Sequence, residues 1–173
     1  MHDRFRFSCA LVLGVLVAGA ACAEPIEASR GQWSGAVAER SANAPGQGRV
    51  ALRVEGTAER FKLELANAGG PVFAGEFVRG ERKDVYGPPA AKGLMSMLGR
   101  GSTVNPVDGK PLAWARRTGD ELVVYLLDLR NGAHRLDRMA IVPADGRVRV
   151  AFERREHDRP VERFTATLER AKP

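Results

Sequence analysis

The sequence contains almost no cysteine and no hydrophobic run long enough to cross a membrane. Its two cysteines, Cys9 and Cys22, both lie near the N-terminus. The rest of the chain therefore offers no disulfide, no thiol nucleophile and no thiolate ligand for a metal. The apolar run Cys9–Val17 is too short for a transmembrane helix, which needs about 20 residues. The domain that follows must be stabilised by a hydrophobic core.

Histidine and aromatic residues are scarce as well. The chain has 3 histidines in 173 residues, and aromatic side chains make up 6% of it. Because a protein metal site usually needs three or four ligands, we expect no metal ion and no cofactor. The net charge is +6. No basic run is long or interleaved with aromatic residues, so we expect no nucleic-acid partner either.

The first 23 residues have the features of a secretory signal peptide. Arg4 and Arg6 give a basic start, Cys9–Val17 forms the apolar centre, and Ala21–Ala23 fits a cleavage site with small residues. Cleavage after Ala23 predicts an exported protein that is periplasmic or secreted. The chain then divides into a signal peptide at 1–23, a leader at 24–30 and one domain at 31–171.

A second interpretation applies to the same segment. Gly19–Cys22 resembles a bacterial lipobox, in which the cysteine is lipidated and becomes the first residue of the mature protein. The lipobox pattern has leucine or another aliphatic residue where this sequence has Gly19. The alternatives are therefore soluble export, or a lipoprotein that is anchored to the membrane through Cys22.

Beyond this segment, apolar residues alternate with polar ones in several short runs. Val50, Leu52 and Val54 alternate in this way, and the same period of two recurs in Phe61–Leu65 and Phe164–Leu168. A period of two places the apolar side chains on one face of a half-buried β-strand. No stretch has the pattern of a long helix, so the sequence predicts an all-β domain.

The clearest hairpin lies in Lys110–Asp128. Its two runs, Leu112–Arg116 and Glu121–Asp128, are rich in strand-forming residues, and the turn between them contains Gly119. About eight to ten short strands joined by local hairpins predict an up-and-down antiparallel β-barrel, because closure removes the exposed sheet edges. A β-sandwich is the alternative fold.

The two ends of the predicted barrel resemble those of lipocalins and related calycin barrels. Gly31-Gln32-Trp33 is similar to the Gly-x-Trp motif that opens the first strand in that superfamily. The resemblance implies that Trp33 closes one end of a lipocalin-like barrel. It also implies that Arg170, from the last strand, packs over the indole as a cation–π contact.

The same ends also resemble nitrobindin-type haem barrels, through Gly31–Gly35 and Phe164–Arg170. In that family the iron-ligating histidine stands just before the final Thr-x-Thr-Leu run. This sequence has Arg163 and Phe164 at that place. The resemblance therefore does not imply a haem.

A closed barrel of this size favours a binding protein for a small apolar or amphipathic ligand. We expect the ligand to contact large apolar side chains inside the barrel. Two methionines at the barrel mouth belong to the irregular segment 90–105 and suit an adaptable apolar surface. The candidate ligand-binding residues are Phe61, Phe73, Met95, Met97, Trp114 and Tyr125.

The alternative function is a non-enzymatic structural or interaction protein of the cell envelope, with a filled barrel core and a basic outer face. That outer face comprises Arg147, Arg149, Arg154, Arg155 and Arg159. No motif identifies an enzyme. The sequence leaves open a Ser/His/Asp set of Ser96, His134 and Asp137, but Ser96 does not stand in a Gly-x-Ser-x-Gly motif.

Overall fold

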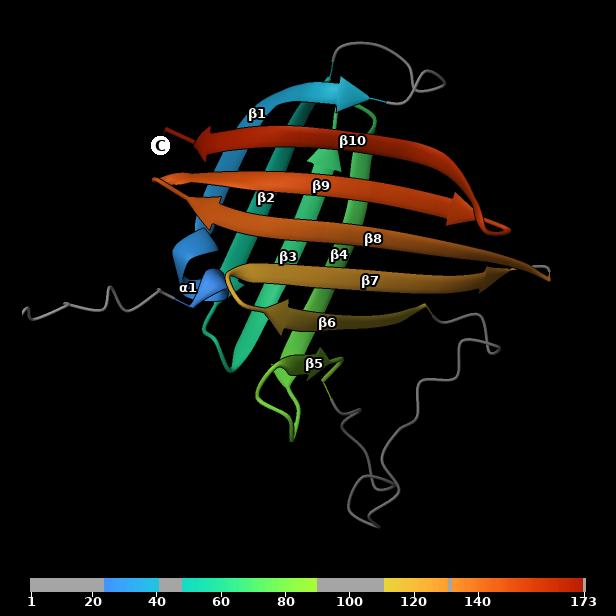
Figure 1. The fold of residues 1–173 in the computed structure, drawn as a ribbon, viewed down its shortest axis with the longest axis horizontal. Coiled ribbons are helices and arrows are strands. Elements are labelled where there is room, and N and C mark those ends of the chain that lie inside the picture. Colours follow the sequence, from blue (N-terminus) through green and yellow to red (C-terminus); the bar gives the residue numbers. More distant parts are fainter. Residues whose placement is uncertain (1–23, 41–47, 90–110, 131, 173) are drawn as a thin grey trace, which may run out of the picture.

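The protein is described by a computed structural model that covers residues 24–40, 48–89, 111–130 and 132–172. The described residues form one short helix and ten strands (Figure 1). These are α1 (Pro25–Ser29), β1 (Gly31–Arg40), β2 (Arg49–Gly56), β3 (Arg60–Asn67), β4 (Gly70–Arg79), β5 (Val85–Gly87), β6 (Leu112–Thr118), β7 (Glu121–Arg130), β8 (Ala133–Ala144), β9 (Arg147–Glu156) and β10 (Arg159–Arg170).

The strands close into a barrel in which each strand pairs antiparallel with its neighbours in sequence. β1 and β10 pair to complete the ring, with Trp33 opposite Arg170. In Figure 1, β7 to β10 cross in front of β2 to β4 at a steep angle. The predicted up-and-down antiparallel barrel is therefore confirmed, and the β-sandwich alternative is wrong.

The alternation of apolar residues in the sequence is what fills the barrel. Val50, Leu52 and Val54 of β2 are each 1% exposed, while the residues between them lie on the surface. The same pattern buries Phe61, Leu63 and Leu65 of β3. A shift of one residue would move each set to solvent, so burial fixes the pairing of the strands.

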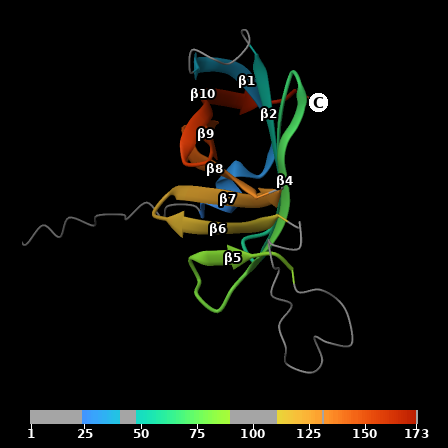
Figure 2. The ribbon, with the colours of Figure 1, turned by 90° about the vertical axis from the view of Figure 1, so that its right-hand side faces the viewer.

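The barrel is paired unevenly around its circumference. β5 pairs with β4 only at Val78 and Arg79, and with β6 only at Ala115 and Arg116. Figure 2 shows β4 on one side of the barrel and β6 to β8 on the other, with β5 between them at the bottom. Within the described residues, the ladder between β4 and β6 is therefore open along the rest of their length.

The two ends of the barrel are formed by different elements. The α1 end contains α1, the start of β1 and the end of β10, whereas the far end contains the turns from β7 to β8 and from β9 to β10. The segment 24–30, predicted to be a leader, contains α1 and packs into the fold, with Ile26 1% exposed. No helix in the described part of the chain is long and apolar enough to cross a membrane.

Candidate functional site

The interior near the α1 end is filled by aromatic side chains. The ring centroid of Phe61 lies 5.0 Å from that of Phe77 and 5.3 Å from that of Tyr86, and all three residues are fully buried. Phe73 stacks on Phe77 from the other side, at 6.3 Å. Gly75 makes room for these rings, because a Cβ there would lie 2.9 Å from the Phe77 ring. This half of the barrel is a packed core.

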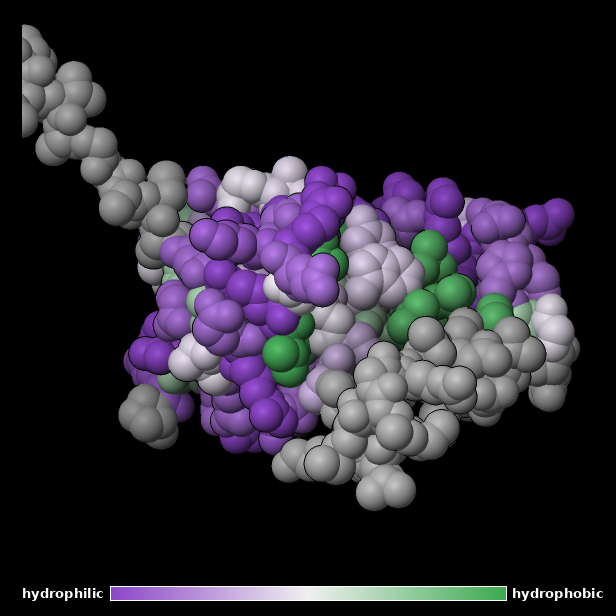
Figure 3. All heavy atoms as spheres, turned by 90° about the horizontal axis from the view of Figure 1, so that it is seen from below, coloured by the Kyte–Doolittle hydropathy of each residue, from purple (hydrophilic) through white to green (hydrophobic). Residues whose placement is uncertain are grey.

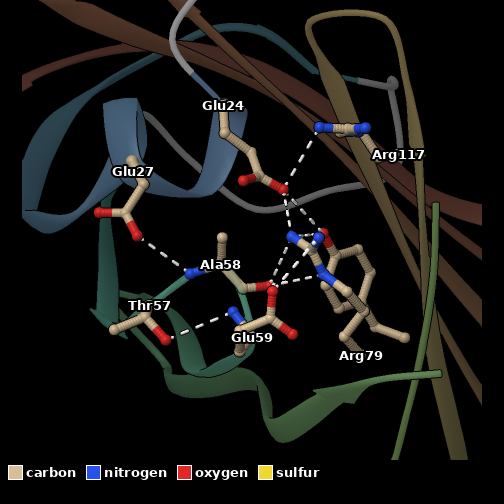
Figure 4. A network of polar contacts seen from close by, with 8 residues as sticks. Glu24, Glu27, Thr57, Ala58, Glu59, Arg79 and Arg117 are labelled. Carbon is tan, nitrogen blue, oxygen red and sulfur yellow. Dashed lines mark hydrogen bonds and ion pairs between the residues drawn. The ribbon is translucent and has the colours of Figure 1, made fainter. Parts of the chain in front are cut away.

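A polar network joins the N-terminal segment to the same end (Figure 4). The Glu24 carboxylate accepts hydrogen bonds from the Tyr86 hydroxyl at 3.2 Å, from Arg117 Nη1 at 3.3 Å and from Arg79. Burial raises the pKa of the Tyr86 phenol, which favours the protonated form that donates this bond. Residues from Glu24 onward are therefore held against the barrel by specific contacts.

Trp33 closes this end from the side of β1. It is 2% exposed, and its Nε1 donates a hydrogen bond of 2.6 Å to the Ser29 carbonyl oxygen. The Arg170 guanidinium lies 4.7 Å from the Trp33 ring centroid, within the range of a cation–π contact. The two residues that the lipocalin resemblance placed together do meet. A contact between two side chains does not by itself identify the chain as a lipocalin.

The inner face of the far end also carries charged residues, and one of them is fully buried. Asp137 of β8 is 1% exposed and accepts two hydrogen bonds from Arg154 of β9, at 2.9 Å from Nε and 3.0 Å from Nη2. Arg154 Nη1 also donates to Glu162 of β10 at 3.2 Å. These three residues lie directly opposite one another on adjacent strands. The hydrogen bonds to Asp137 raise the pKa of Arg154, so this guanidinium stays charged.

Arg135 stands next to this group and is less completely paired. Its Nη2 lies 3.7 Å from Asp128 Oδ2, and its Nε lies 3.6 Å from Asp137 Oδ1. The Nε atom is buried and has no hydrogen-bond partner among the described residues. A buried donor without an acceptor is unfavourable. Arg135 can therefore donate a hydrogen bond to a further acceptor, such as an oxygen of a bound molecule or of water.

Partly buried apolar side chains lie on the same inner face, and Leu126 stands directly opposite Asp137 in the strand register. Ala113 of β6, Leu126 of β7 and Val37 of β1 are only partly buried and pack against the core. Phe73, near the start of β4, is buried and stacks on Phe77 in the packed half of the barrel. Together with the charged residues, the partly buried side chains make an amphipathic inner surface at the far end.

Two of the predicted ligand-binding residues lie on the wrong side of the sheet. Trp114 and Tyr125 stack at 5.0 Å, but they alternate with Ala115 and Val124, which are fully buried inside the barrel. Neighbouring residues of a strand point to opposite faces. The prediction that Trp114 and Tyr125 line the interior is therefore wrong, because the strand buries its small residues and leaves its largest one outside.

The other predicted residues have different outcomes. Phe61 and Phe73 do point into the barrel, but Phe61 is enclosed by other rings. Phe73 is the one nearer to the amphipathic surface. Met95, Met97 and Cys22 lie outside the described residues.

The residues of the charged inner face were not predicted as a site. Arg154 was expected on a basic outer face and instead points inward, in line with Val150 and Phe152 of the same strand. The signal was available, because Val148, Val150 and Phe152 set an alternation that Arg154 continues. Because arginine side chains are mostly exposed, the charge of Arg154 favours an outward position in a prediction from sequence.

The outer face is less basic than the sequence suggested. Arg147 pairs with Glu169 at 3.2 Å, and Arg155 pairs with Glu153 at 2.7 Å. The face of the molecule in Figure 3 is mainly hydrophilic, with smaller hydrophobic groups between the polar residues. Two arginines of the predicted basic face, Arg147 and Arg155, are thus paired with neighbouring carboxylates.

Neither a catalytic relay nor a metal cluster is formed by the described residues. Asp137 pairs with Arg154 inside the barrel, whereas His134 Nε2 lies 3.4 Å from Asp158 Oδ1. Ser96, the third member of the considered set, lies outside the described residues. In the part of the chain that the structure describes, no three His, Cys, Asp or Glu residues are grouped to hold a metal ion.

Comparisons with known proteins add a similarity of shape. No protein-family model and no curated protein matches the chain. Among solved structures, the wild-type fluorescent protein UnaG has a TM-score of 0.46 and 15% identity, over 84% of this chain and 99% of that chain. A single-substitution variant of UnaG has a TM-score of 0.46 and 14% identity, over 86% of this chain and 99% of its own. These values leave the family of the chain, including the lipocalin and nitrobindin resemblances, undetermined.

Proposed function

We propose that this protein is an exported binding module that takes a small amphipathic molecule at the far end of its barrel. The observation that carries the proposal is the ion-paired group Asp137, Arg154 and Glu162 on the inner face. Buried ion pairs add little stability, and apolar residues of similar volume often stabilise a fold better. A barrel with a purely structural interior has no need of this group, whereas a binding surface does.

The ligand proposed here has an apolar part and a polar part with a hydrogen-bond acceptor. The apolar part packs against Ala113 and Leu126, because Leu126 lies opposite Asp137 and Ala113 lies opposite Leu126 in the strand register. The acceptor receives a hydrogen bond from the buried Nε of Arg135, which has no partner among the described residues. Binding is passive burial, and a few polar groups set the orientation of the ligand.

Export is the second part of the proposal, and it rests on the N-terminal sequence. The Glu24 side chain is bonded to Arg79, Tyr86 and Arg117, so a cleavage site C-terminal to Glu24 would remove contacts of the fold. This supports cleavage at Ala23 and a periplasmic or secreted protein. Lipidation of Cys22 is the alternative, and the intact mass of the mature protein distinguishes the two by a diacylglyceryl adduct.

A second candidate function is favoured by the aromatic packing near the α1 end. A barrel with a filled core can serve as a non-enzymatic interaction protein of the cell envelope, without any small ligand. The two candidates differ in whether the far end is occupied. Native mass spectrometry of the protein purified from its own cells separates them by the presence of a co-purified small molecule.

Titration with a dansyl-labelled fatty acid tests the binding proposal. We expect saturable binding that Arg135→Ala weakens by about tenfold, the equivalent of one hydrogen bond to a charged group. The matched control is Arg138→Ala, because Arg138 lies on the same strand, points to the outer face and pairs with Glu121 at 3.8 Å. An equal loss in both variants, or no saturable binding together with no co-purified molecule, contradicts the proposal.

A further inference from the structure

Two histidines meet at the rim of the far end, where the turn from β9 to β10 passes the start of β8. His157 N donates a hydrogen bond of 3.2 Å to the His134 carbonyl oxygen, next to the paired residues Arg135 and Glu156. The two imidazole centroids lie 5.6 Å apart, at an interplanar angle of 59°. The backbone of the sheet therefore holds these side chains side by side.

The turn that carries His157 has an unusual sequence for its conformation. His157 and Asp158 have φ angles of 48° and 64°, so both occupy the left-handed region. Two-residue hairpin turns of this kind favour Asn-Gly or Asp-Gly, because a side chain is disfavoured there. The hairpin between β8 and β9 follows that rule with Asp145 and Gly146. His157 and Asp158 thus stand where glycine would relieve the backbone.

The surroundings of the two imidazoles suit a cation. His134 Nε2 lies 3.4 Å from Asp158 Oδ1, and a carboxylate at one ring nitrogen leaves the other nitrogen free to bind a metal. A hollow of about 200 Å³ is lined by both histidines and by Asp128, Arg135 and Glu156. The carboxylates outnumber the single arginine around this hollow, which favours positive charge.

We propose that His134 and His157 bind one divalent transition-metal ion, with Asp158 as the positioning residue that orients His134. Imidazole nitrogens favour Zn²⁺, Cu²⁺ and Ni²⁺ over Mg²⁺ and Ca²⁺, which prefer oxygen ligands. Two protein ligands leave the remaining coordination positions to water. The two metal ligands lie at the rim and differ from Arg135, the hydrogen-bond donor of the proposed ligand site, although Arg135 lines the same hollow. Metal titration without the dansyl probe tests the metal site separately from the ligand proposal.

Calorimetric titration of the protein without a polyhistidine tag tests the site, with ZnCl₂, CuCl₂ and NiCl₂ as probes and MgCl₂ as the negative control. We expect equimolar binding of the transition metals and none of Mg²⁺. His134→Ala and His157→Ala should each lower the association constant by more than tenfold, and Asp158→Asn by about tenfold. The matched control is Asp145→Asn, in the corresponding turn at the other end, which should change nothing.

Electron paramagnetic resonance of the Cu²⁺ complex provides the second measurement. We expect nitrogen couplings from two imidazoles in the wild type and from one imidazole in each histidine variant. Since both histidines lie at the rim, the variants should keep the wild-type melting temperature, and His134→Gln and His157→Gln preserve a polar side chain if they do not. Wild-type affinity in both histidine variants, or the absence of nitrogen couplings, overturns the proposal.

Discussion

The two ends of this barrel both carry inward arginines, but the carboxylates that pair with them differ in burial: the Glu24 side chain at the α1 end is 23% exposed, whereas that of Asp137 at the far end is 1% exposed. At the α1 end, Phe61, Phe77 and Tyr86 pack ring against ring, and the segment that begins at Glu24 covers them. At the far end, Asp137 and Arg154 occupy inward positions of β8 and β9. Aromatic packing dominates the first end, whereas a fully buried carboxylate stands among the inward residues of the second. The proposed function assigns stability to the α1 end and ligand binding to the far end.

The largest expected effect comes from the aromatic end. Phe61→Ala removes a fully buried ring that contacts two others, so the free energy of unfolding should fall by about 3–5 kcal/mol. Leu126→Ala is the control at the far end, where a partly buried side chain should account for about 1–2 kcal/mol. Urea unfolding measures both. Equal losses at the two ends would remove the contrast.

For the charged group, the change in the free energy of unfolding should depend on whether one residue of the ion pair or both are replaced. Asp137→Ala leaves Arg154 without its main partner, so we expect a loss of about 3 kcal/mol in the free energy of unfolding. Replacing both residues, as Asp137→Leu with Arg154→Met, should leave stability within about 1 kcal/mol of the wild type or raise it. A double variant as unstable as the single one would show that the ion pair is needed for folding.

Much of this contrast was not predictable, although the fold was. The alternation in Val50–Val54 and Phe61–Leu65 predicted half-buried strands, and the local hairpins favoured the antiparallel barrel over the alternative β-sandwich. The face of β6 could not be read in the same way. In this strand Trp114 stands between two alanines. Ala115 lies opposite the buried residues Tyr86 and Val124, and this pairing shows that Ala115, not Trp114, faces the interior.

The charged inner face could not be predicted from the sequence for a related reason. Arg154 follows an inward series on β9, but an arginine inside a barrel is stable only beside partners such as Asp137 and Glu162. Those partners come from two other strands. Sequence alone does not bring the three together, whereas the strand register does.

A smaller effect is expected from the N-terminal cover of the α1 end. Glu24→Gln removes the charge that Arg79 and Arg117 share, and these side chains are partly exposed, so we expect a loss of about 1–2 kcal/mol. Thermal unfolding measures the change. The control is Glu27→Gln, since Glu27 is exposed and pairs with Arg30 at 3.5 Å, and its hydrogen bond from Ala58 N at 3.0 Å can also be accepted by a glutamine oxygen. A similar shift in both variants argues against a specific role for Glu24.

The smallest effect should come from the contact between Trp33 and Arg170. Arg170→Ala removes a partly exposed cation–π contact, which we expect to contribute about 0.5–1 kcal/mol. The emission of Trp33 should shift, and a Trp114→Phe background isolates it from the second tryptophan. Unchanged emission would mean that the two side chains do not meet in solution.

The central claim is that the far end keeps its inward charges for a ligand and not for stability. The most direct measurement is titration of the Asp137→Leu/Arg154→Met double variant and the wild type with a dansyl-labelled fatty acid, with unfolding curves of both proteins. The account predicts a folded double variant of wild-type stability that binds the probe at least about tenfold more weakly. Wild-type affinity in a folded double variant would contradict it.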